Sequence, residues 1–450
     1  MKFRGEDDRF LERALHSARD TRHLEIGPGA RHAAAGVFAQ QFGSSPSLVI
    51  ADENTFAAAG RDVYDSLRSA GQVADDPLVL PGDVYAEYPV VRRIVATLEK
   101  SLAIPLAVGS GTLNDLTKRA AHECGRPYMV VATAASMDGY TAFGASLTQR
   151  GSKQTFDCPA PQAVVADLDV IANAPAGMNA AGYADLLAKC PAGADWIVAD
   201  ALGEEPIDTN AWDTVQSRLR TWLANPEGVC RGDSEALRNL TVGLMMTGFA
   251  MQSARSSRPA SGAEHQFSHL WDMEHHTHNG RAPSHGFKVG IGSLASLALY
   301  ESLLARDVDL LDVDLLANNW PDAAANDREI EALFDVPELA EKARLESSAK
   351  LLTRDQLWAQ LETLKRAWPE LRERLRRQLI STQETRDMLA AAGAPVKSSQ
   401  IGIGRDRLRQ SYLKAFHIRR RFTVLDLARR TGLLADSLAQ IFRERPSDEP

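Results

Sequence analysis

The stretch IPLAVGSGTLNDLTKRA, residues 104–120, carries the pattern that decides the fold. Its first five residues are almost entirely apolar, which is typical of a β-strand buried on both faces. Gly109-Ser110-Gly111 then lets the backbone turn sharply, because glycine adopts conformations that other residues avoid. From Thr112 onward the apolar positions repeat with helical spacing. A buried strand, a glycine turn and a helix in this order predict part of a β-α-β unit.

The same alternation continues on both sides of this stretch through the first 170 residues. We expect strands at 47–52, 77–80, 104–108 and 127–134, and helices at 54–71, 84–101 and 112–124. Continuous apolar strands that alternate with helices indicate a mostly parallel sheet. From about Asp169 nearly every segment has helical period instead. The sequence therefore predicts an α/β domain at 1–170 and an all-α domain at 171–450.

The composition is that of a globular protein with 450 residues, 44% of them hydrophobic and 24% charged. The 59 Asp and Glu residues outnumber the 51 Lys and Arg residues, and a net charge of −8 argues against binding to nucleic acid or an anionic membrane. The first 20 residues lack the apolar core of a signal peptide. Leu240–Met251, the most apolar helical stretch, is too short to span a bilayer. We expect a cytoplasmic protein without membrane insertion.

The four cysteines lie far apart in the sequence, at Cys124, Cys158, Cys190 and Cys230. No C-x-x-C pair is present, which excludes a thiolate zinc knuckle and a thioredoxin-like motif. Four cysteines in a chain of this length also make a poor disulfide framework. We therefore expect reduced thiols in the core.

The glycine turn has some features of a phosphate-binding loop. The amides of Gly111, Thr112 and Leu113 would open a helix whose positive N-terminal end suits a phosphate. The third glycine of the dinucleotide fingerprint is replaced by Asn114, and no acidic residue follows at the expected spacing. Asp52 ends an earlier strand and could offer its carboxylate to a ribose from that side. On these residues alone, a phosphate site and a plain strand-to-helix turn both stay open.

TAASMDGY, residues 133–140, follows the next strand, at the edge where open α/β sheets bind ligands. Thr133 and Ser136 can donate to a phosphate or a nicotinamide amide, and Asp138 can accept from a hydroxyl. Asp138-Gly139 is also a common turn pair. The motif is therefore compatible with a ligand contact and with a simple turn.

Six of the 11 histidines fall within 21 residues, from His265 to His285. His265 and His269 are four residues apart and share one face of a helix. Gln266 stands where H-E-x-x-H metalloproteases have their catalytic glutamate, which argues against peptide hydrolysis. Two imidazoles and a carboxylate would leave a metal with an open coordination position, as in catalytic sites, and suit Zn, Ni or Fe. The histidine pattern does not show which acidic residue would supply the carboxylate.

Two other groups of basic side chains are expected to be solvated. His275, His276 and His278 flank an Asn-Gly loop, where histidines usually face water. Arginines and lysines are also frequent from Arg405 to Arg430. The stretch VLDLARRTGLLADSLAQIF could form a helix-turn-helix, but it lacks a base-reading pattern and the chain lacks net positive charge. We expect terminal helices with a solvated basic face.

Several long motifs together resemble the glycerol-1-phosphate dehydrogenase family, within the dehydroquinate synthase-like and iron-type alcohol dehydrogenase superfamily. In chain order they are GSGTLNDLTKRAA, VATAASMDGYTAFGASL, PQAVVADLDVIANAPAGMNAAGYADLLAK, GADWIVAD, SGAEHQFSH and SHGFKVGIG. The terminal IGIGRDRLRQSY and IRRRFTVLDLA are similar to the bacterial branch of this family. The resemblance covers nearly the whole chain.

The resemblance implies a dehydroquinate synthase-like fold and an NAD(P)H-dependent, metal-assisted oxidoreductase. The reaction would interconvert dihydroxyacetone phosphate and sn-glycerol 1-phosphate, or a closely related ketose and polyol phosphate. Residues 1–170 would bind the nucleotide, and residues 171–450 would bind metal and substrate. The enzyme would be a cytoplasmic homodimer that binds no nucleic acid.

The resemblance also implies the site residues. One divalent ion, Zn, Ni or Fe, would be held by Asp185, His265 and His285. Asp185 and His269 would be catalytic, and both would bind the substrate together with Asp138. The predicted cofactor-binding residues also include Asp52, which was proposed above from its place at a strand end. They are Asp52, Gly109, Gly111, Thr112, Leu113, Asn114, Asp115, Thr133, Ala134, Ala135 and Ser136.

Two other interpretations stay open. A dehydroquinate synthase-like cyclising lyase has the same architecture and uses NAD catalytically, although it would need several basic residues around a polyhydroxylated acid, whose motifs we do not find here. A non-catalytic regulator that binds metal or nucleotide would use the basic C-terminal segment on DNA. Net loss of NADH on addition of a ketose phosphate separates the dehydrogenase from both.

Overall fold

This computed structural model describes residues 6–149 and 152–443. The chain forms two compact units, and each of them consists of three separate segments of the sequence. The first unit comprises Met1–Leu186, Thr209–Ala260 and Ala391–Gly393, and the second comprises Leu187–Asp208, Ser261–Ala390 and Ala394–Pro450. Helices begin to dominate near residue 170, as expected, but the helices between residues 209 and 254 belong to the unit that contains the sheet.

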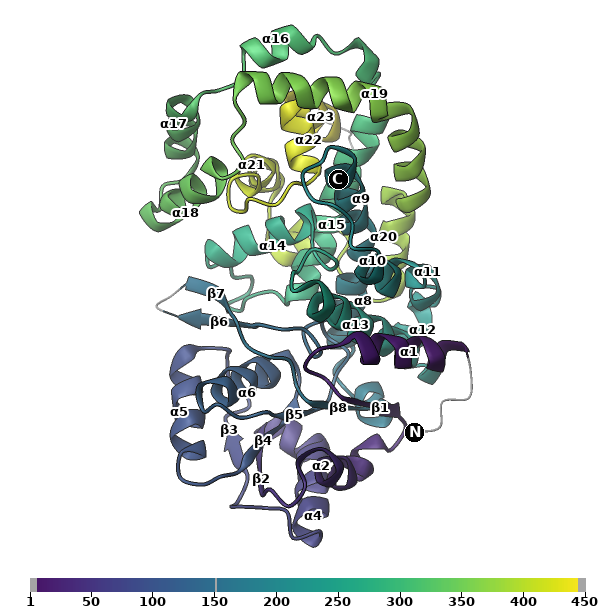
Figure 1. The fold of residues 1–450 in the computed structure, drawn as a ribbon, viewed down its shortest axis with the longest axis vertical. Helices are drawn as coiled ribbons and strands as arrows, with labels where there is room; N and C mark the ends of the chain where they lie inside the picture. The colour runs from purple at the N-terminus through teal and green to yellow at the C-terminus, as the bar shows by residue number, and fades with distance from the viewer. Residues whose placement is uncertain (1–5, 150–151, 444–450) are drawn as a thin grey trace. The chain divides into compact units, whose positions relative to one another are not determined.

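A six-stranded sheet forms the centre of the first unit, and every neighbouring pair of strands in it is parallel. Its order is β1-β8-β5-β4-β2-β3 (Figure 1). The strands are β1 (His23–Gly27), β2 (Ser47–Asp52), β3 (Leu78–Leu80), β4 (Ile104–Gly109), β5 (Met129–Ala132) and β8 (Ala163–Asp167). The predicted parallel sheet and four of its strands are confirmed. The edge strand β1 and the central strand β8 were not among the predicted strands.

Helices cover both faces of this sheet, because successive strand residues point to opposite sides. Val49 and Ala51 pack with α2 (Ala34–Phe42) and α4 (Arg61–Ser69). Leu48 and Ile50, which alternate with them along β2, pack with α5 (Tyr88–Leu98) and α6 (Gly111–Glu123). Figure 1 draws α5 and α6 apart from α2 and α4. The continuous apolar strands of the sequence are thus explained by burial on both sides.

Two predicted helices differ from the structure in detail. The helix expected at 54–71 is divided into α3 (Glu53–Thr55), a π-helical turn η2 (Phe56–Gly60) and α4. The helix expected at 84–101 begins only at Tyr88, because Pro89 is favourable in a first helical turn. The unit also contains a β-hairpin, β6 (Ala145–Gln149) with β7 (Ser152–Phe156), which was not predicted.

Short and long helices complete the first unit. They are α1 (Glu6–Ser17), η1 (Ala30–Ala33), α7 (Leu168–Ala172), α8 (Ala176–Leu187), α10 (Thr209–Gln216), α11 (Leu219–Trp222), α12 (Pro226–Arg231) and α13 (Ser234–Ala254). The apolar stretch Leu240–Met251 lies within α13 and is buried. Its apolar character therefore reflects a core position.

The named elements of the second unit, within the described residues, are all helices. Its helices are α9 (Lys189–Ala201), α14 (Ala263–Met273), α15 (His285–Leu304), η3 (Val308–Leu310), α16 (Val313–Asn318), α17 (Ala323–Leu333), α18 (Pro337–Ser348), α19 (Arg354–Gln378), α20 (Thr382–Ala391), η4 (Ser398–Ile401), α21 (Arg405–Ala415), α22 (Val424–Arg430) and α23 (Leu434–Ile441). The predicted change from α/β to all-α structure is confirmed.

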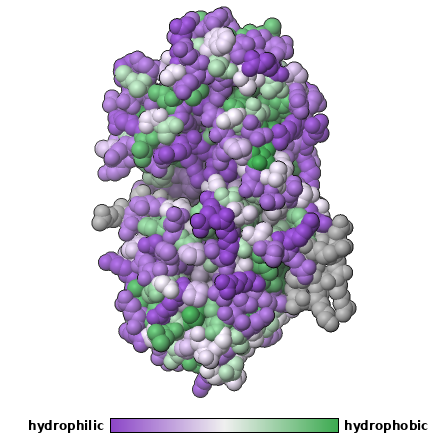
Figure 2. Space-filling model, in the orientation of Figure 1, coloured by the Kyte–Doolittle hydropathy of each residue, from purple (hydrophilic) through white to green (hydrophobic). Residues whose placement is uncertain are grey.

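The helix α15 forms the core of this second unit. Among the described residues it is the one helix that is long and apolar enough to cross a membrane, yet 78% of its most apolar window is buried inside the protein. Hydrophilic residues predominate on the face drawn in Figure 2. The apolar length of α15 is therefore that of a core helix.

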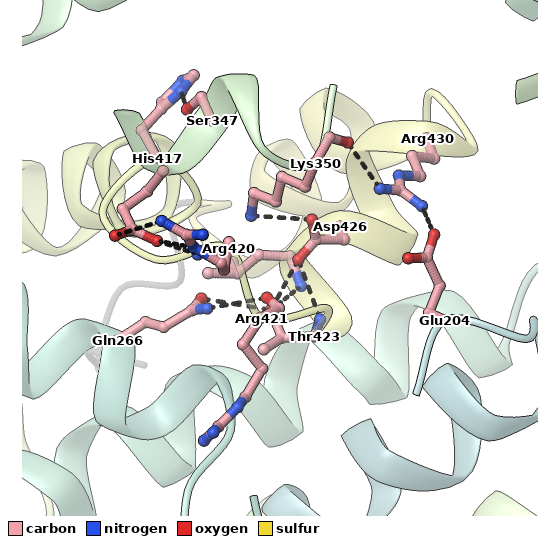
Figure 3. Close-up of polar contacts among 12 residues, drawn as sticks. Glu204, Gln266, Ser347, Lys350, His417, Arg420, Arg421, Thr423, Asp426 and Arg430 are labelled. Atoms are coloured by element: carbon pink, nitrogen blue, oxygen red, sulfur yellow. Dashed lines mark hydrogen bonds and ion pairs between the residues drawn. The ribbon is translucent and has the colours of Figure 1, made fainter. Parts of the chain in front are cut away.

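The expected solvated basic face is wrong for several side chains of the C-terminal helices. Arg430 is almost fully buried and forms an ion pair with Glu204, as Figure 3 shows. Arg429, also largely buried, pairs with Glu329. Arg420 is exposed, as expected, and its Nε lies 2.9 Å from a Glu346 carboxylate oxygen. These cations neutralise acidic residues of the same unit, which a count of charges along the sequence does not reveal.

The expectation of core thiols is wrong for one of the four cysteines. Cys158 and Cys190 are buried and Cys124 is half-buried, but Cys230 is exposed at the end of α12.

The two helices that carry the clustered histidines, α14 and α15, pack closely at one glycine. A Cβ on Gly292 of α15 would lie 2.4 Å from the Glu264 carbonyl oxygen on α14. Because that oxygen belongs to the backbone, it cannot rotate away, and only glycine permits this helix separation.

We therefore expect Gly292→Ala to lower the free energy of unfolding by about 1–3 kcal/mol, the usual cost of an overpacked core. Urea unfolding followed by circular dichroism measures this change. The matched control is Gly36→Ala, an exposed position within α2 where a Cβ meets nothing within 4 Å. That control should be neutral or stabilising by up to about 1 kcal/mol. Equal stability of Gly292→Ala and the wild type would contradict the packing argument.

Candidate active site

A cavity of about 800 Å³ lies at the carboxyl end of the sheet in the first unit. Residues at the carboxyl ends of β2, β4 and β5 line it, among them Asp52, Ser110 and Thr133. Parallel strands end at one common edge, which is where open α/β sheets bind their ligands. The remaining lining residues are Arg31, Asn54, Thr55, Ala58, Gly82, Val84, Thr112, Asp169, Val170, Asn173, Ala174, Pro175 and Met178.

The glycine turn brings the start of α6 to this cavity. A Cβ on Gly109 would lie 2.5 Å from the Leu113 Cβ, so glycine is needed for the helix to begin this close to β4. Ser110 and Thr112 line the cavity. Leu113 packs instead into the apolar core between the sheet and α5. Of the predicted residues in this turn, Thr112 therefore lines the cavity, and its neighbour Ser110, which was not predicted, lines it as well.

Asn114 and Asp115 support the neighbouring loops in the structure. The Asn114 Nδ2 donates to the Gly139 carbonyl at 3.3 Å, and its Oδ1 accepts from the Tyr128 hydroxyl at 3.1 Å. The Asp115 Oδ2 accepts from the Ser146 amide at 3.0 Å. Neither side chain is among those that line the cavity. Asn114 in the place of a third glycine thus anchors the loop that follows β5.

Lys118 is a buried residue of this region that sequence reasoning missed. Its ammonium donates to the carbonyl oxygens of Gly139, Ala142 and Gly144 at 3.0, 2.8 and 2.9 Å. An ammonium has three donors, so these three bonds use its full capacity. Burial lowers the pKa of Lys118, and the Asp115 carboxylate opposes that shift. The lysine fixes the loop between β5 and β6.

Asp52 has two roles at the end of β2. Its Oδ1 accepts from the Thr55 amide at 2.8 Å and so caps α3, while the residue also lines the cavity. Sequence reasoning missed an ion pair nearby. Arg31 lines the same cavity, and its Nη1 lies 2.8 Å from Asp167 Oδ2. These residues are 136 positions apart, so no local motif links them.

The loop after β5 lies against α8. Thr133 lines the cavity, and the Ala135 amide donates to the Asn179 Oδ1 at 3.1 Å. A Cβ on Gly182 of α8 would lie only 1.8 Å from the Ala135 carbonyl oxygen, so the two backbones are in direct contact. Ala134 and Ala135 are both buried, and the Ala134 carbonyl accepts from the Tyr140 hydroxyl at 2.7 Å.

Asp138 and Asp185 are brought together by this contact. Asp185 lies three residues after Gly182 on α8 and is fully buried. Its Oδ2 accepts from the Asp138 backbone amide at 3.1 Å. The two aspartates predicted to contact the substrate are thus neighbours in space, although 47 residues separate them in the sequence.

Three histidines of the second unit form a cluster on α14 and α15. The ring centroid of His265 lies 5.2 Å from that of His285 and 6.1 Å from that of His269. The predicted helical placement of His265 and His269 on one element is confirmed. His285 is the first residue of α15, where Ser284 caps the helix by accepting from the Phe287 amide.

His265 and His285 each have a partner at the Nδ1 atom of the ring. The His265 Nδ1 lies 2.9 Å from Glu264 Oε1, and the His285 Nδ1 lies 3.4 Å from the Ser268 hydroxyl. Such partners orient the ring and leave Nε2 for a metal. Burial holds the pKa of His265 well below its ordinary value, and the positive charge of Lys189 adds to that effect. A neutral imidazole is the form that binds metal.

Asp185 of the first unit and His265 and His285 of the second carry the ligand atoms of the predicted metal site. One carboxylate and two imidazoles form the donor set that suits Zn, Ni or Fe. Two nitrogen ligands and one oxygen ligand also leave a coordination position for a substrate, as catalytic sites require. The residues present therefore fit a catalytic divalent ion.

One of the three loop histidines is buried, which corrects the expectation that all of them are solvated. His276 is 8% exposed, and its Nε2 lies 2.6 Å from the Ile401 carbonyl oxygen. Its Nδ1 lies 2.7 Å from the Arg407 guanidinium. His275 is exposed, as expected. His276 therefore ties its loop to α21 within the second unit.

Solved structures define the class of this fold. Glycerol dehydrogenase from Schizosaccharomyces pombe covers 93% of this chain with a TM-score of 0.58 at 15% identity, and 90% of its own chain is covered. Maleylacetate reductase from Agrobacterium tumefaciens covers 93% with a TM-score of 0.58 at 15% identity, and 96% of its own chain is covered. The sequence profile of the iron-containing alcohol dehydrogenases matches residues 25–175. The chain has the fold of that class.

Relatives in sequence narrow the assignment. The glycerol-1-phosphate dehydrogenase of Geobacillus stearothermophilus is 30% identical over 381 residues, which are 84% of this chain and 85% of the relative. Those of Halalkalibacterium halodurans and Thermococcus kodakarensis are 34% and 32% identical, over 58% and 64% of this chain and over 66% and 81% of their own lengths. The chain belongs to the glycerol-1-phosphate dehydrogenase family. It is an enzyme, an oxidoreductase of the NAD(P)-dependent type.

The position of Asp52 in the cavity generates a prediction about the cofactor. A carboxylate at the end of this strand would accept from a ribose 2′-hydroxyl of NADH and repel the 2′-phosphate of NADPH. We expect Asp52→Asn to raise kcat/KM with NADPH relative to NADH by about tenfold, the effect of roughly 1.4 kcal/mol. Asparagine keeps the oxygen that caps α3, so the helix should persist. Steady-state kinetics with both cofactors measures the ratio.

The control for this variant is Asp65→Asn, which removes one negative charge from an exposed position on α4. Its cofactor ratio should equal that of the wild type. An unchanged ratio in Asp52→Asn itself would show that this carboxylate does not face the ribose.

Proposed function

We propose that the enzyme interconverts dihydroxyacetone phosphate and sn-glycerol 1-phosphate with NAD(P)H and one divalent metal ion. Membership in the glycerol-1-phosphate dehydrogenase family supports the substrate class. The observation that carries the proposal is the donor set of Asp185, His265 and His285, because an oxidoreductase of this kind needs a Lewis acid beside its carbonyl group. We further expect a cytoplasmic homodimer.

The cavity at the carboxyl edge supports the proposed cofactor site. Ser110 and Thr112 lie at the N-terminus of α6, whose positive dipole end suits a pyrophosphate. Gly109 and Gly111 let that backbone approach closely, and the amides of Leu113, Asn114 and Asp115 continue the first turn. Asp52 would accept from the ribose of the adenosine. Thr133 to Ser136 would face the nicotinamide, with Thr133 already at the cavity wall.

The metal and the cofactor, when bound, supply a Lewis acid for the substrate oxygen and a hydride for its carbon. Asp185 would hold the metal and orient the substrate, and its bond to the Asp138 amide fixes its carboxylate for that purpose. Asp138 would accept from a substrate hydroxyl. His269, half-buried beside His265 and His285, would pass a proton to the product oxygen.

Removal of a proposed metal ligand provides the first test. We expect His265→Ala and Asp185→Asn to lose the ion on dialysis and to lower kcat at least about 100-fold, because a Lewis acid contributes several kcal/mol to the transition state. Elemental analysis of the dialysed protein gives the metal content, and circular dichroism shows whether the fold persists.

The matched control for the metal test is His275→Asn. His275 belongs to the same histidine-rich stretch but is exposed, and asparagine tolerates its positive φ of 51°. Its metal content and activity should equal those of the wild type. Full activity of a folded, metal-free His265→Ala protein would disprove the metal-assisted mechanism.

The redox stoichiometry separates the proposed dehydrogenase from a cyclising lyase. With dihydroxyacetone phosphate we expect one NADH to be consumed for each glycerol phosphate formed, and chiral analysis should give the sn-1 product. The absorbance of NADH follows the reaction. A lyase restores its NAD in each turnover, so steady NADH absorbance during product formation would favour that alternative.

Zn, Ni and Fe, added singly to the dialysed protein, would identify the metal.

A further inference from the structure

The motif GADWIVAD contains a carboxylate, Asp195, that the proposed mechanism does not use. Asp195 lies on α9 and is fully buried. Its Oδ2 accepts from the Ala263 amide at 2.7 Å. Its Oδ1 accepts from the Tyr300 hydroxyl at 2.6 Å and from the Val424 amide at 2.8 Å. One carboxylate on α9 is therefore bonded to α14, α15 and α22, all within the second unit.

Two of these bonds come from the first residues of helices. Ala263 begins α14 and Val424 begins α22. Amides at a helix N-terminus have no acceptor within the helix, and the helix dipole makes this end positive. Two such ends stabilise a negative charge that would otherwise be costly to bury. Asp195 thus supplies both helices with an acceptor.

The start of α14 depends on Asp195 for a specific reason. The residue that precedes the helix is Gly262, which has no side chain to cap it. A Cβ on Gly262 would lie 2.3 Å from Asp195 Oδ2, so no capping residue fits in its place. The carboxylate from α9 therefore occupies the position that a capping side chain would take.

The same turn of α14 is held from the other side by the C-terminal segment. The Gln266 side-chain Nε2 donates to the Arg421 carbonyl at 3.3 Å, and its Oε1 accepts from the Thr423 hydroxyl at 3.3 Å. Figure 3 shows these residues together. The Arg421 guanidinium donates to the Ser261 carbonyl at 2.9 Å. Gln266 directly follows His265, so these contacts surround the turn that carries a proposed metal ligand.

We propose that Asp195 is a positioning residue for the metal centre. It sets the first turn of α14, and with it His265, relative to α15, which carries His285. This inference rests on the proposed metal site of the enzyme. Asp195 itself acts through the helix starts that it caps.

Replacement by asparagine tests this role with little change in volume. An amide has one accepting oxygen, and its NH2 group cannot accept from a backbone amide. In either orientation of the Asn side chain, Ala263 or Val424 loses its acceptor, and the first turn of α14 should shift. Loss of supporting contacts to metal ligands typically lowers metal affinity 10–100-fold.

The experiment compares the full-length wild type, Asp195→Asn, Tyr300→Phe and Asp200→Asn, each stripped of metal and titrated with Co²⁺ alone. Visible absorption reports the geometry of bound Co²⁺, and the titration reports its affinity. We expect Asp195→Asn to bind about 10–100-fold more weakly with altered absorption bands. Tyr300→Phe, which removes one of three donors, should show a smaller loss. Asp200→Asn, five residues along α9 and partly exposed, should behave as wild type.

The outcomes separate this inference from the proposed function. If the wild type binds Co²⁺ and a folded Asp195→Asn binds it with equal affinity and an identical spectrum, Asp195 does not position the site and this inference is wrong. If Asp195→Asn does not fold, Tyr300→Phe decides: weaker binding supports the role, and wild-type binding overturns it. If the wild type itself binds no Co²⁺, the proposed metal centre fails, and this inference fails with it.

Discussion

The common direction of the six strands is the constraint on which the first unit depends. Because parallel strands all end at one edge, the residues after β2, β4 and β5 meet there, although more than 80 positions separate Asp52 from Thr133. From β2 the chain passes to β3 on one side and then returns to β4 on the other, so the connections diverge between β2 and β4. Such a reversal opens a crevice at the sheet edge, and the cavity lies at that crevice.

The apolar patterns along the sequence were sufficient to predict the strands whose burial those patterns reflect. SLVIAD and IPLAV are apolar because both faces of their strands are covered, and their positions were predicted to within a residue or two. β1 was missed because His23 and Glu25 interrupt its apolar pattern at a sheet edge. Its pairing with β8 joins His23 to Ala163, a contact that no sequence window contains. The π-helical turn at 56–60 was equally invisible, since its residues have ordinary helical character.

The candidate site divides in the same way. Asp52, Thr112 and Thr133 could be predicted because each lies at or just after the end of a recognisable strand, and all three line one cavity. Leu113 and Asn114, by contrast, belong to the buried face of α6, and helical spacing would have placed them there. Arg31, Lys118 and His276 were beyond sequence reasoning because their roles depend on partners far along the chain. Residue type shows what a side chain can do, whereas burial and pairing decide what it does.

Burial also explains why the crowding of histidines was a weaker signal than it first appeared. Six histidines share one short segment, yet burial separates them. His275 is exposed, and His276 joins a loop to α21. Burial holds the pKa of His265 well below its ordinary value. A buried imidazole and a buried carboxylate are each costly without a partner, and here Glu264 bonds to His265 and the Asp138 amide bonds to Asp185. The arrangement is easier to understand if the protein maintains these polar groups for a ligand, because an apolar core would be simpler to build.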